Sequence, residues 1–129
     1  MAKTPTQVKR AIARYIASLR RHIRVDAVIL FGSYAVGHPH EWSDIDLAII
    51  SPDFDGKDLF RRVKLMAKAR AERDIDIEAL GYGKKEFDSA HRQTFLGEVI
   101  RKGKIVYQSP RLKRRRHALK QRETTSARA

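Results

Sequence analysis

The chain has 129 residues, of which 42% are hydrophobic and 33% charged, a composition typical of one globular domain. It contains no cysteine, which excludes disulfide scaffolds, cysteine-ligated zinc sites and thiol nucleophiles. The longest apolar runs, 27–31 and 47–50, are far shorter than the roughly 20 residues of a membrane helix. Because residues 1–9 are polar and basic and do not resemble an apolar export signal, we expect a cytoplasmic protein with no membrane association.

The net charge of +13 is concentrated at the two ends of the chain. Residues 1–25 carry seven Lys or Arg and no acid, and residues 109–129 carry eight against one, whereas 26–108 is nearly neutral. Basic ends on a neutral body indicate an anionic partner, either RNA or an acidic protein, unless the charge serves only solubility. We therefore predict a domain over 1–108 and a basic tail over 109–129, which has too few apolar residues to order alone.

Helices and strands alternate along the chain. Thr4 and Pro5 mark a helix start, and Gly103 is the expected end of a later helix. The periodicity predicts helices over 4–22, 57–72 and 85–102 and strands over 26–31, 43–51, 74–80 and 104–107. The helix over 57–72 is expected to turn Leu59, Phe60, Val63, Met66 and Ala69 inward. This order predicts an α/β (α+β) fold, a small mixed β-sheet with helices packed on one face.

Two motifs on consecutive strands have residues suited to chemistry. Asp44 and Asp46 are two apart in a strand, so they share a face and repel each other unless a cation lies between them. Few carboxylate oxygens around a cation suit Mg²⁺, which keeps other positions for water and phosphates. Upstream, Gly32 lets the backbone approach a ligand, and Ser33 offers an N–H and a hydroxyl to terminal phosphates. The motifs together predict a nucleotide-plus-metal site.

Residues 28–50, VILFGSYAVGHPHEWSDIDLAII, resemble the nucleotidyltransferase superfamily typified by DNA polymerase beta, and most of all its minimal, MNT-type branch. The similarity continues more loosely through IDIEAL at 75–80 and EVIRKGKIVY at 98–107. The resemblance implies a polymerase-beta-like nucleotidyltransferase fold. It also implies a nucleoside triphosphate bound by Gly32 and Ser33, and two Mg²⁺ ions held by Asp44, Asp46 and a third carboxylate on a neighbouring strand.

Three acids on the predicted strand 74–80 are candidates for the third carboxylate. We favour Asp76 as the catalytic and metal-binding residue, because its flanking isoleucines place it in the middle of the strand. Asp74 would take this role if the register shifts by two residues, and Glu78 ranks last. The alternative is an acidic strand face that is simply solvated.

The loop between the two motifs offers weaker candidates. His38 and His40 could touch a base or a phosphate, although loop histidines are more often idle. Trp42 is expected to be a packing anchor in preference to a base-stacking platform. Tyr34 and Val36 stand where relatives often carry arginine, which removes charge that could bind phosphate.

The resemblance implies a Mg-dependent enzyme that moves a nucleoside monophosphate, AMP from ATP, onto an acceptor hydroxyl. Relatives act as antitoxins that adenylylate a small helical HEPN-type toxin, so a toxin–antitoxin partner is the expected acceptor. The alternative is a non-catalytic module that binds a nucleotide, RNA or a partner, and nucleotide addition to an RNA end ranks third. The sequence leaves open the acceptor, the preferred base and the oligomeric state.

Overall fold

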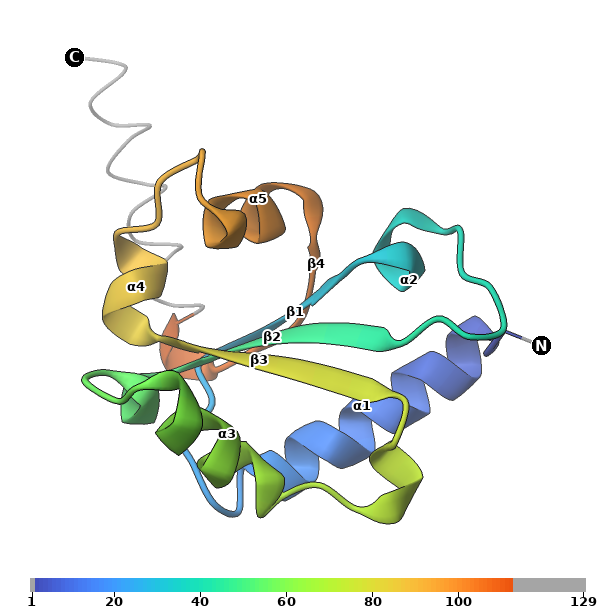
Figure 1. Ribbon diagram of the computed structural model, residues 1–129, viewed down its shortest axis with the longest axis horizontal. Coiled ribbons are helices and arrows are strands. Elements are labelled where there is room, and N and C mark those ends of the chain that lie inside the picture. Colours follow the sequence, from blue (N-terminus) through green and yellow to red (C-terminus); the bar gives the residue numbers. More distant parts are fainter. Residues whose placement is uncertain (1, 113–129) are drawn as a thin grey trace.

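The computed structural model describes residues 2–112, which fold around a four-stranded sheet in the order β3-β2-β1-β4 (Figure 1). Strand β1 pairs antiparallel with β2 and β4, and β2 pairs parallel with β3, so the predicted mixed sheet is confirmed. The elements in chain order are α1 (Pro5–Leu19), β1 (Ala27–Phe31), α2 (Ser33–Val36), β2 (Ile45–Ser51), η1 (Pro52–Phe54), α3 (Leu59–Ala67), η2 (Glu72–Asp74), β3 (Ile77–Gly83), α4 (Lys84–Asp88), α5 (Phe95–Lys102) and β4 (Lys104–Gln108).

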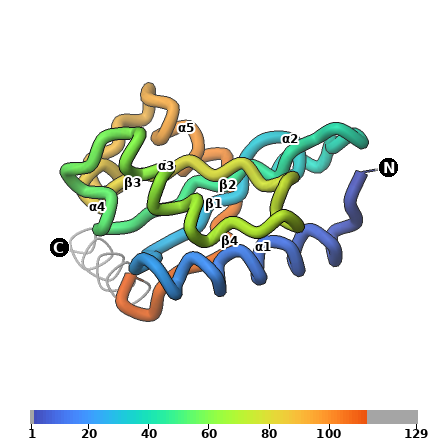
Figure 2. The backbone as a smooth tube through the Cα atoms, turned by 60° about the horizontal axis from the view of Figure 1, so that its bottom comes forward, coloured from blue at the N-terminus to red at the C-terminus, as the bar shows by residue number. Residues whose placement is uncertain are grey.

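Helices cover both faces of the sheet, whereas the sequence predicted one. Val28 and Leu30 of β1 pack with the apolar side of α1, including Tyr15 and Leu19. Their neighbour Ile29 points to the opposite face, where it packs in a second cluster with residues of α5. Figures 1 and 2 show α1 and α3 on one side of the sheet and α5 on the other. The apolar runs in β1 and β2 are continuous because both faces of these central strands are buried.

The predicted helix boundaries follow local capping chemistry. Thr4 caps α1 by accepting a hydrogen bond from the Gln7 N–H, and the Gln7 side chain accepts one from the Thr4 N–H. The helix ends at Leu19, three residues before the predicted end. At the end of α5, a Cβ on Gly103 would lie 2.5 Å from the Val99 carbonyl oxygen, so only glycine fits there.

Helix α3 does not turn its predicted apolar stripe inward. Phe60 is 74% exposed and Val63 51%, whereas Met66 and Ala69 are buried as expected. The helix lies against β3, an edge strand of the sheet, so the residues at its start project past the core. Leu59 is likewise exposed, which corrects the prediction for the first turn of this helix.

The described chain continues past the predicted domain boundary at Gln108. The Ser109 N–H donates to the Asp26 carbonyl, and Leu112 is buried against Ala27 and Leu96. Residues 109–112 therefore pack on the domain, and the rest of the predicted tail, 113–129, lies outside the described residues. Within 2–112, none of the helices combines the length and apolar character needed to cross a membrane.

Candidate functional site

The close approach of Gly32 to Asp46 joins the two sequence motifs. Gly32 follows β1 directly and has φ +75° and ψ −158°, a backbone conformation that is almost exclusive to glycine. A Cβ built on Gly32 would lie 2.2 Å from Oδ2 of Asp46. The glycine thus lets a carboxylate of β2 lie against the backbone of the turn after β1.

The turn that follows Gly32 is helical. Ser33 opens the four-residue α2, and the N–H groups of Ala35 and Val36 both donate to the Gly32 carbonyl. Gly37 ends this turn with φ +80°. The arrangement places Ser33 beside the end of β1.

Asp44 and Asp46 stand at the start of β2. Asp46 is the second residue of the strand and Asp44 precedes it, with the fully buried Ile45 between them pointing to the core. Antiparallel pairing puts Asp46 opposite Phe31, and parallel pairing puts it opposite Glu78. Burial raises the pKa of the Asp46 carboxyl, and the negative charges of Glu78 and then Asp44 raise it further. A cation at this position would relieve the repulsion.

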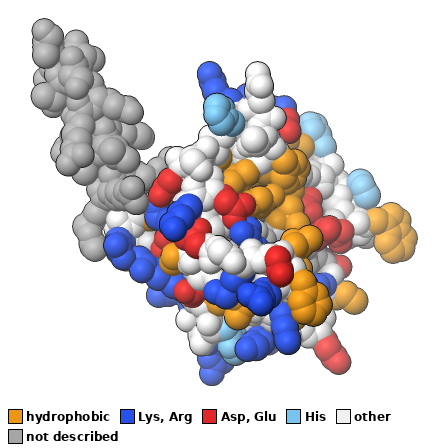
Figure 3. Space-filling model, turned by 60° about the vertical axis from the view of Figure 1, so that its left-hand side comes forward, with side chains coloured by type: hydrophobic (Ala, Val, Ile, Leu, Met, Phe, Trp, Pro, Cys, Tyr) orange, Lys and Arg blue, Asp and Glu red, His pale blue; other side chains and the backbone are white. Residues whose placement is uncertain are grey.

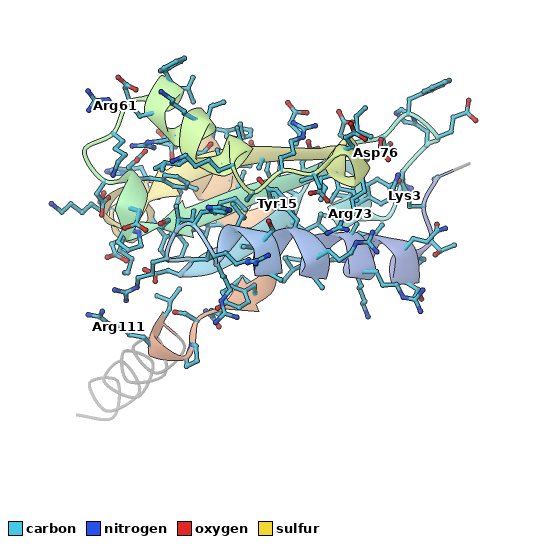
Figure 4. All side chains as sticks on the ribbon, turned by 90° about the horizontal axis from the view of Figure 1, so that it is seen from below. Lys3, Tyr15, Arg61, Arg73, Asp76 and Arg111 are labelled. Atoms are coloured by element: carbon cyan, nitrogen blue, oxygen red, sulfur yellow. The ribbon has the colours of Figure 1, made fainter. Side chains whose placement is uncertain are left out.

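The third strand begins later than predicted, at Ile77, so the expected mid-strand position of Asp76 is wrong. Asp76 comes just before β3, and its carbonyl accepts a 2.7 Å hydrogen bond from the Ile45 N–H, which keeps it beside the start of β2. Its carboxylate forms an ion pair with Lys3, and the Lys3 backbone N–H donates to the Tyr34 hydroxyl. Figure 4 shows Lys3 and Asp76 close together at this end of the molecule.

Asp74 is directed away from the Asp44–Asp46 pair. It lies in η2, is 3% exposed, and accepts a hydrogen bond from the Ala71 N–H. Its charge acts on Tyr15 of α1: burial raises the pKa of the Tyr15 hydroxyl to about 12, Arg70 lowers it, and Asp74 raises it. The structure therefore brings Asp76 and Glu78 towards the aspartate pair and leaves Asp74 on the side of α1.

The carboxylates at this site are ligands of the type that a hard divalent cation binds, although they do not form a complete metal site. Among residues 2–112, no group of three or more His, Asp or Glu side chains is arranged to hold a metal ion. Burial is the main cause of the raised pKa of Asp46, and the negative charges of Glu78 and Asp44 add to it; carboxylate oxygens are the ligands Mg²⁺ takes. A Mg²⁺ ion held by only a few carboxylates would keep coordination positions free for phosphate oxygens.

The loop between the motifs is exposed. Trp42 is 81% exposed, so the expectation of a packing anchor is wrong. The backbone N–H of Trp42 donates to Nδ1 of His40, and the backbone N–H of His40 donates to the Ser43 hydroxyl. These hydrogen bonds hold the loop together just before Asp44. His38 and Val36 are both exposed. The hydrogen bonds of the described residues do not join either of them to the carboxylates.

Sequence reasoning missed two neighbours of the site. Glu78 ranked last as a third carboxylate, but the parallel register places it directly opposite Asp46. Lys3 was counted only as one of the basic N-terminal residues, and no pattern around it indicates that it pairs with Asp76. Both depend on long-range contacts.

Known proteins resemble the chain over most of its length. The family model described as "Polymerase beta, Nucleotidyltransferase" matches residues 14–111. A protein of Methanocaldococcus jannaschii named as a candidate protein adenylyltransferase is 29% identical over 102 residues, which cover 77% of this chain and 97% of the relative.

Two solved structures share the fold. A candidate nucleotidyltransferase from Sulfolobus solfataricus superposes with a TM-score of 0.62 at 14% identity, covering 84% of this chain and 92% of that one. A crystal structure of a toxin–antitoxin complex with AMP-PNP gives a TM-score of 0.55 at 24% identity, covering 91% of this chain and 98% of the matched chain.

Proposed function

The chain belongs to the Polymerase beta nucleotidyltransferase family, and we propose that it transfers AMP from ATP to an acceptor hydroxyl. The observation that carries the proposal is the contact of the Gly32 backbone with the Asp46 carboxylate, because it joins a phosphate-binding turn to a metal-binding pair. The M. jannaschii relative supports the adenylyl group, since it is named as a candidate protein adenylyltransferase and is matched over nearly its whole length.

The chain's own residues would bind and orient the nucleotide. The Ser33 N–H and hydroxyl would donate to terminal phosphate oxygens, and Gly32 lets the turn that carries Ser33 lie against the Asp46 carboxylate. Asp44, Asp46 and Asp76, which lie at and just before the starts of β2 and β3, would hold two Mg²⁺ ions. When bound, Mg²⁺ neutralises triphosphate charge and lowers the pKa of the acceptor hydroxyl. The acceptor oxygen would attack the α-phosphorus, pyrophosphate would leave and the hydroxyl proton would pass to water, so that catalysis would depend mainly on positioning and electrostatics.

We propose that the acceptor is a hydroxyl on a partner protein of the small helical HEPN type. The resemblance to MNT-type antitoxins implies this partner, and the toxin–antitoxin complex that shares the fold holds AMP-PNP. A cytoplasmic location follows from the proposal, because ATP is the adenylyl donor.

The test is to coexpress the chain with the protein encoded beside it and to measure the partner's intact mass. We expect the mass of one or more AMP groups to be added, with label transferred from ATP labelled at the α-phosphate and not at the γ-phosphate. Asp44→Asn and Asp46→Asn are expected to abolish the addition. The matched control Asp88→Asn removes one exposed acid on α4 and is expected to retain it. An unmodified partner together with tight ATP binding would favour a non-catalytic binding module.

A further inference from the structure

The end of the sheet opposite the candidate site has a concave, basic surface. Ala27 at the start of β1 pairs with Ile50 and Gln108, whereas Phe31 at the other end pairs with Asp46. Asp26 and Gly32 are six residue steps apart along extended chain, which corresponds to about 20 Å. The two ends of the sheet are therefore distinct surfaces.

The fold brings the two charged ends of the sequence together at this second surface. The segment after α1 supplies Arg24, and the segment after β4 supplies Arg111, although 87 positions separate them in the chain. Both arginines line two adjoining hollows of about 410 and 420 Å³. Figures 2 and 4 show the end of α1 beside the last described residues, and Arg111 is labelled there in Figure 4. We call this surface the basic groove; it is lined by Arg20, Arg24, Lys84, Arg111 and Tyr107.

Positive charge exceeds negative charge in the basic groove. The buried Asp26 carboxylate lies 3.3 Å from Nε of Arg24, and Asp88 pairs with Lys84 at 2.8 Å. The salt bridges of the described residues give no carboxylate partner to Arg20 or Arg111. In the sequence, four consecutive basic residues follow Leu112, at 113–116. Figure 3 shows Lys and Arg side chains near the described end of the chain, with acidic side chains among them.

The chemistry of the groove favours a nucleic acid over an acidic protein. Most of its cations are arginines, whose planar fork binds phosphate through two hydrogen bonds. The Arg20 guanidinium lies over the Tyr107 ring, 5.5 Å from its centre. An arginine supported on an aromatic ring offers a flat surface on which an unpaired base can stack. The acidic side chains of a protein could pair with the positive charges, but they have no aromatic ring to stack on the Arg20–Tyr107 pair.

We propose that the basic groove binds single-stranded nucleic acid, with Arg20 and Arg111 contacting phosphates and the Arg20–Tyr107 pair supporting a base. The bound strand lies at the end of the sheet away from Gly32 and Asp46. Binding is therefore independent of the nucleotide in the candidate site. The proposal does not depend on the transfer reaction.

The test uses the full chain and a fluorescently labelled single-stranded oligouridine, with affinity measured by anisotropy over a range of salt concentrations. The variant Arg20→Gln/Arg111→Gln is expected to weaken binding tenfold or more. It should also reduce the slope of log affinity against log salt by about 1.4, since each lost phosphate contact on a single strand contributes about 0.7. The matched control Arg61→Gln/Lys64→Gln removes two exposed charges from α3 and is expected to change affinity by less than threefold.

Three further measurements separate the parts of the proposal. Arg20→Lys keeps the charge, so it is expected to weaken binding while leaving the salt slope unchanged. AMP-PNP at saturating concentration is expected to leave the oligouridine affinity unchanged. Equal losses in the groove and control variants, displacement of the strand by AMP-PNP, or equally tight binding of polyglutamate would each overturn the proposal. Melting temperatures of all variants verify that they are folded.

Discussion

Replacing Gly32 with alanine tests the contact that joins the two motifs. The new Cβ would start 2.2 Å from Oδ2 of Asp46, whereas ordinary contact begins at 3.4 Å, so the oxygen must move by about 1.2 Å. A misplacement of about 1 Å at a reacting centre can cost about 100-fold in rate. We therefore expect Gly32→Ala to lower AMP transfer by about two orders of magnitude.

The same change also strains the backbone. A side chain at the φ and ψ of Gly32 costs about 1–3 kcal/mol, and each kcal/mol corresponds to roughly 3–5 °C in melting temperature for a domain of this size. Gly37→Ala is the matched control, because Gly37 also has a positive φ of +80° but its Cβ would meet nothing within 4 Å. We expect Gly37→Ala to lose stability by strain alone and to keep the transfer reaction.

The double variant Gly32→Ala/Asp46→Ala separates strain from the clash. Removal of the Asp46 carboxylate should recover the part of the melting temperature that was lost through the clash, while the transfer activity is abolished. The assays are thermal unfolding and transfer of label from ATP. Wild-type transfer by Gly32→Ala, or identical melting temperatures and activities for the Gly32 and Gly37 variants, would refute the assigned contact.

Three other outcomes follow from the described contacts. Asp46→Asn should raise the melting temperature of the metal-free protein near neutral pH. Because the pKa of Asp46 is raised in the native state, ionisation of this carboxyl destabilises the folded protein. The gain in melting temperature should therefore shrink as the pH falls and the wild-type carboxyl becomes protonated in both states. A gain that grows towards acid pH would contradict this. Ser33→Ala should weaken ATP binding by about 1–3 kcal/mol in calorimetry, and an unchanged affinity would remove Ser33 from the site. Phe60→Gln, on the exposed surface of α3, should change the free energy of unfolding by less than about 0.5 kcal/mol, whereas Met66→Ala should lower it by about 2–5 kcal/mol, as measured by denaturant unfolding. The reverse order would show that Phe60 is buried, as the sequence predicted.

The parts of the fold that could be predicted from sequence are those fixed by local chemistry. Thr4 caps α1 because its hydroxyl reaches an N–H three residues on, and Gly32 follows β1 because the chain needs a positive φ there. The strands β1 and β2 were recognisable because both of their faces are buried, which leaves continuous apolar runs. Each of these signals lies within a few residues.

The parts that could not be predicted depend on which element lies beside another. The alternation of acids and isoleucines from 74 to 78 favours a strand, but pairing with β2 begins only at Ile77. The parallel register then places Glu78, ranked last, opposite Asp46. Likewise, the spacing of Phe60 and Val63 is that of a buried helix face, and only the edge position of β3 leaves them exposed.

The choice of third carboxylate between Asp76 and Glu78 can be decided with Lys3. We expect Asp76→Asn to abolish transfer and Glu78→Gln to retain it, since the Asp76 carbonyl is fixed to Ile45, which lies between the two aspartates proposed to bind metal. Lys3 and Asp76 are about one-third and one-half exposed, so their ion pair is worth only about 0.2–1 kcal/mol, and Lys3→Met should raise Mg²⁺ affinity by roughly 1.4- to 5-fold. Calorimetric Mg²⁺ titration should show this gain in the wild-type background and not in Asp76→Asn. If Glu78→Gln abolishes transfer while Asp76→Asn and Lys3→Met leave metal binding unchanged, then Glu78 is the third ligand and Asp76 is only the partner of Lys3.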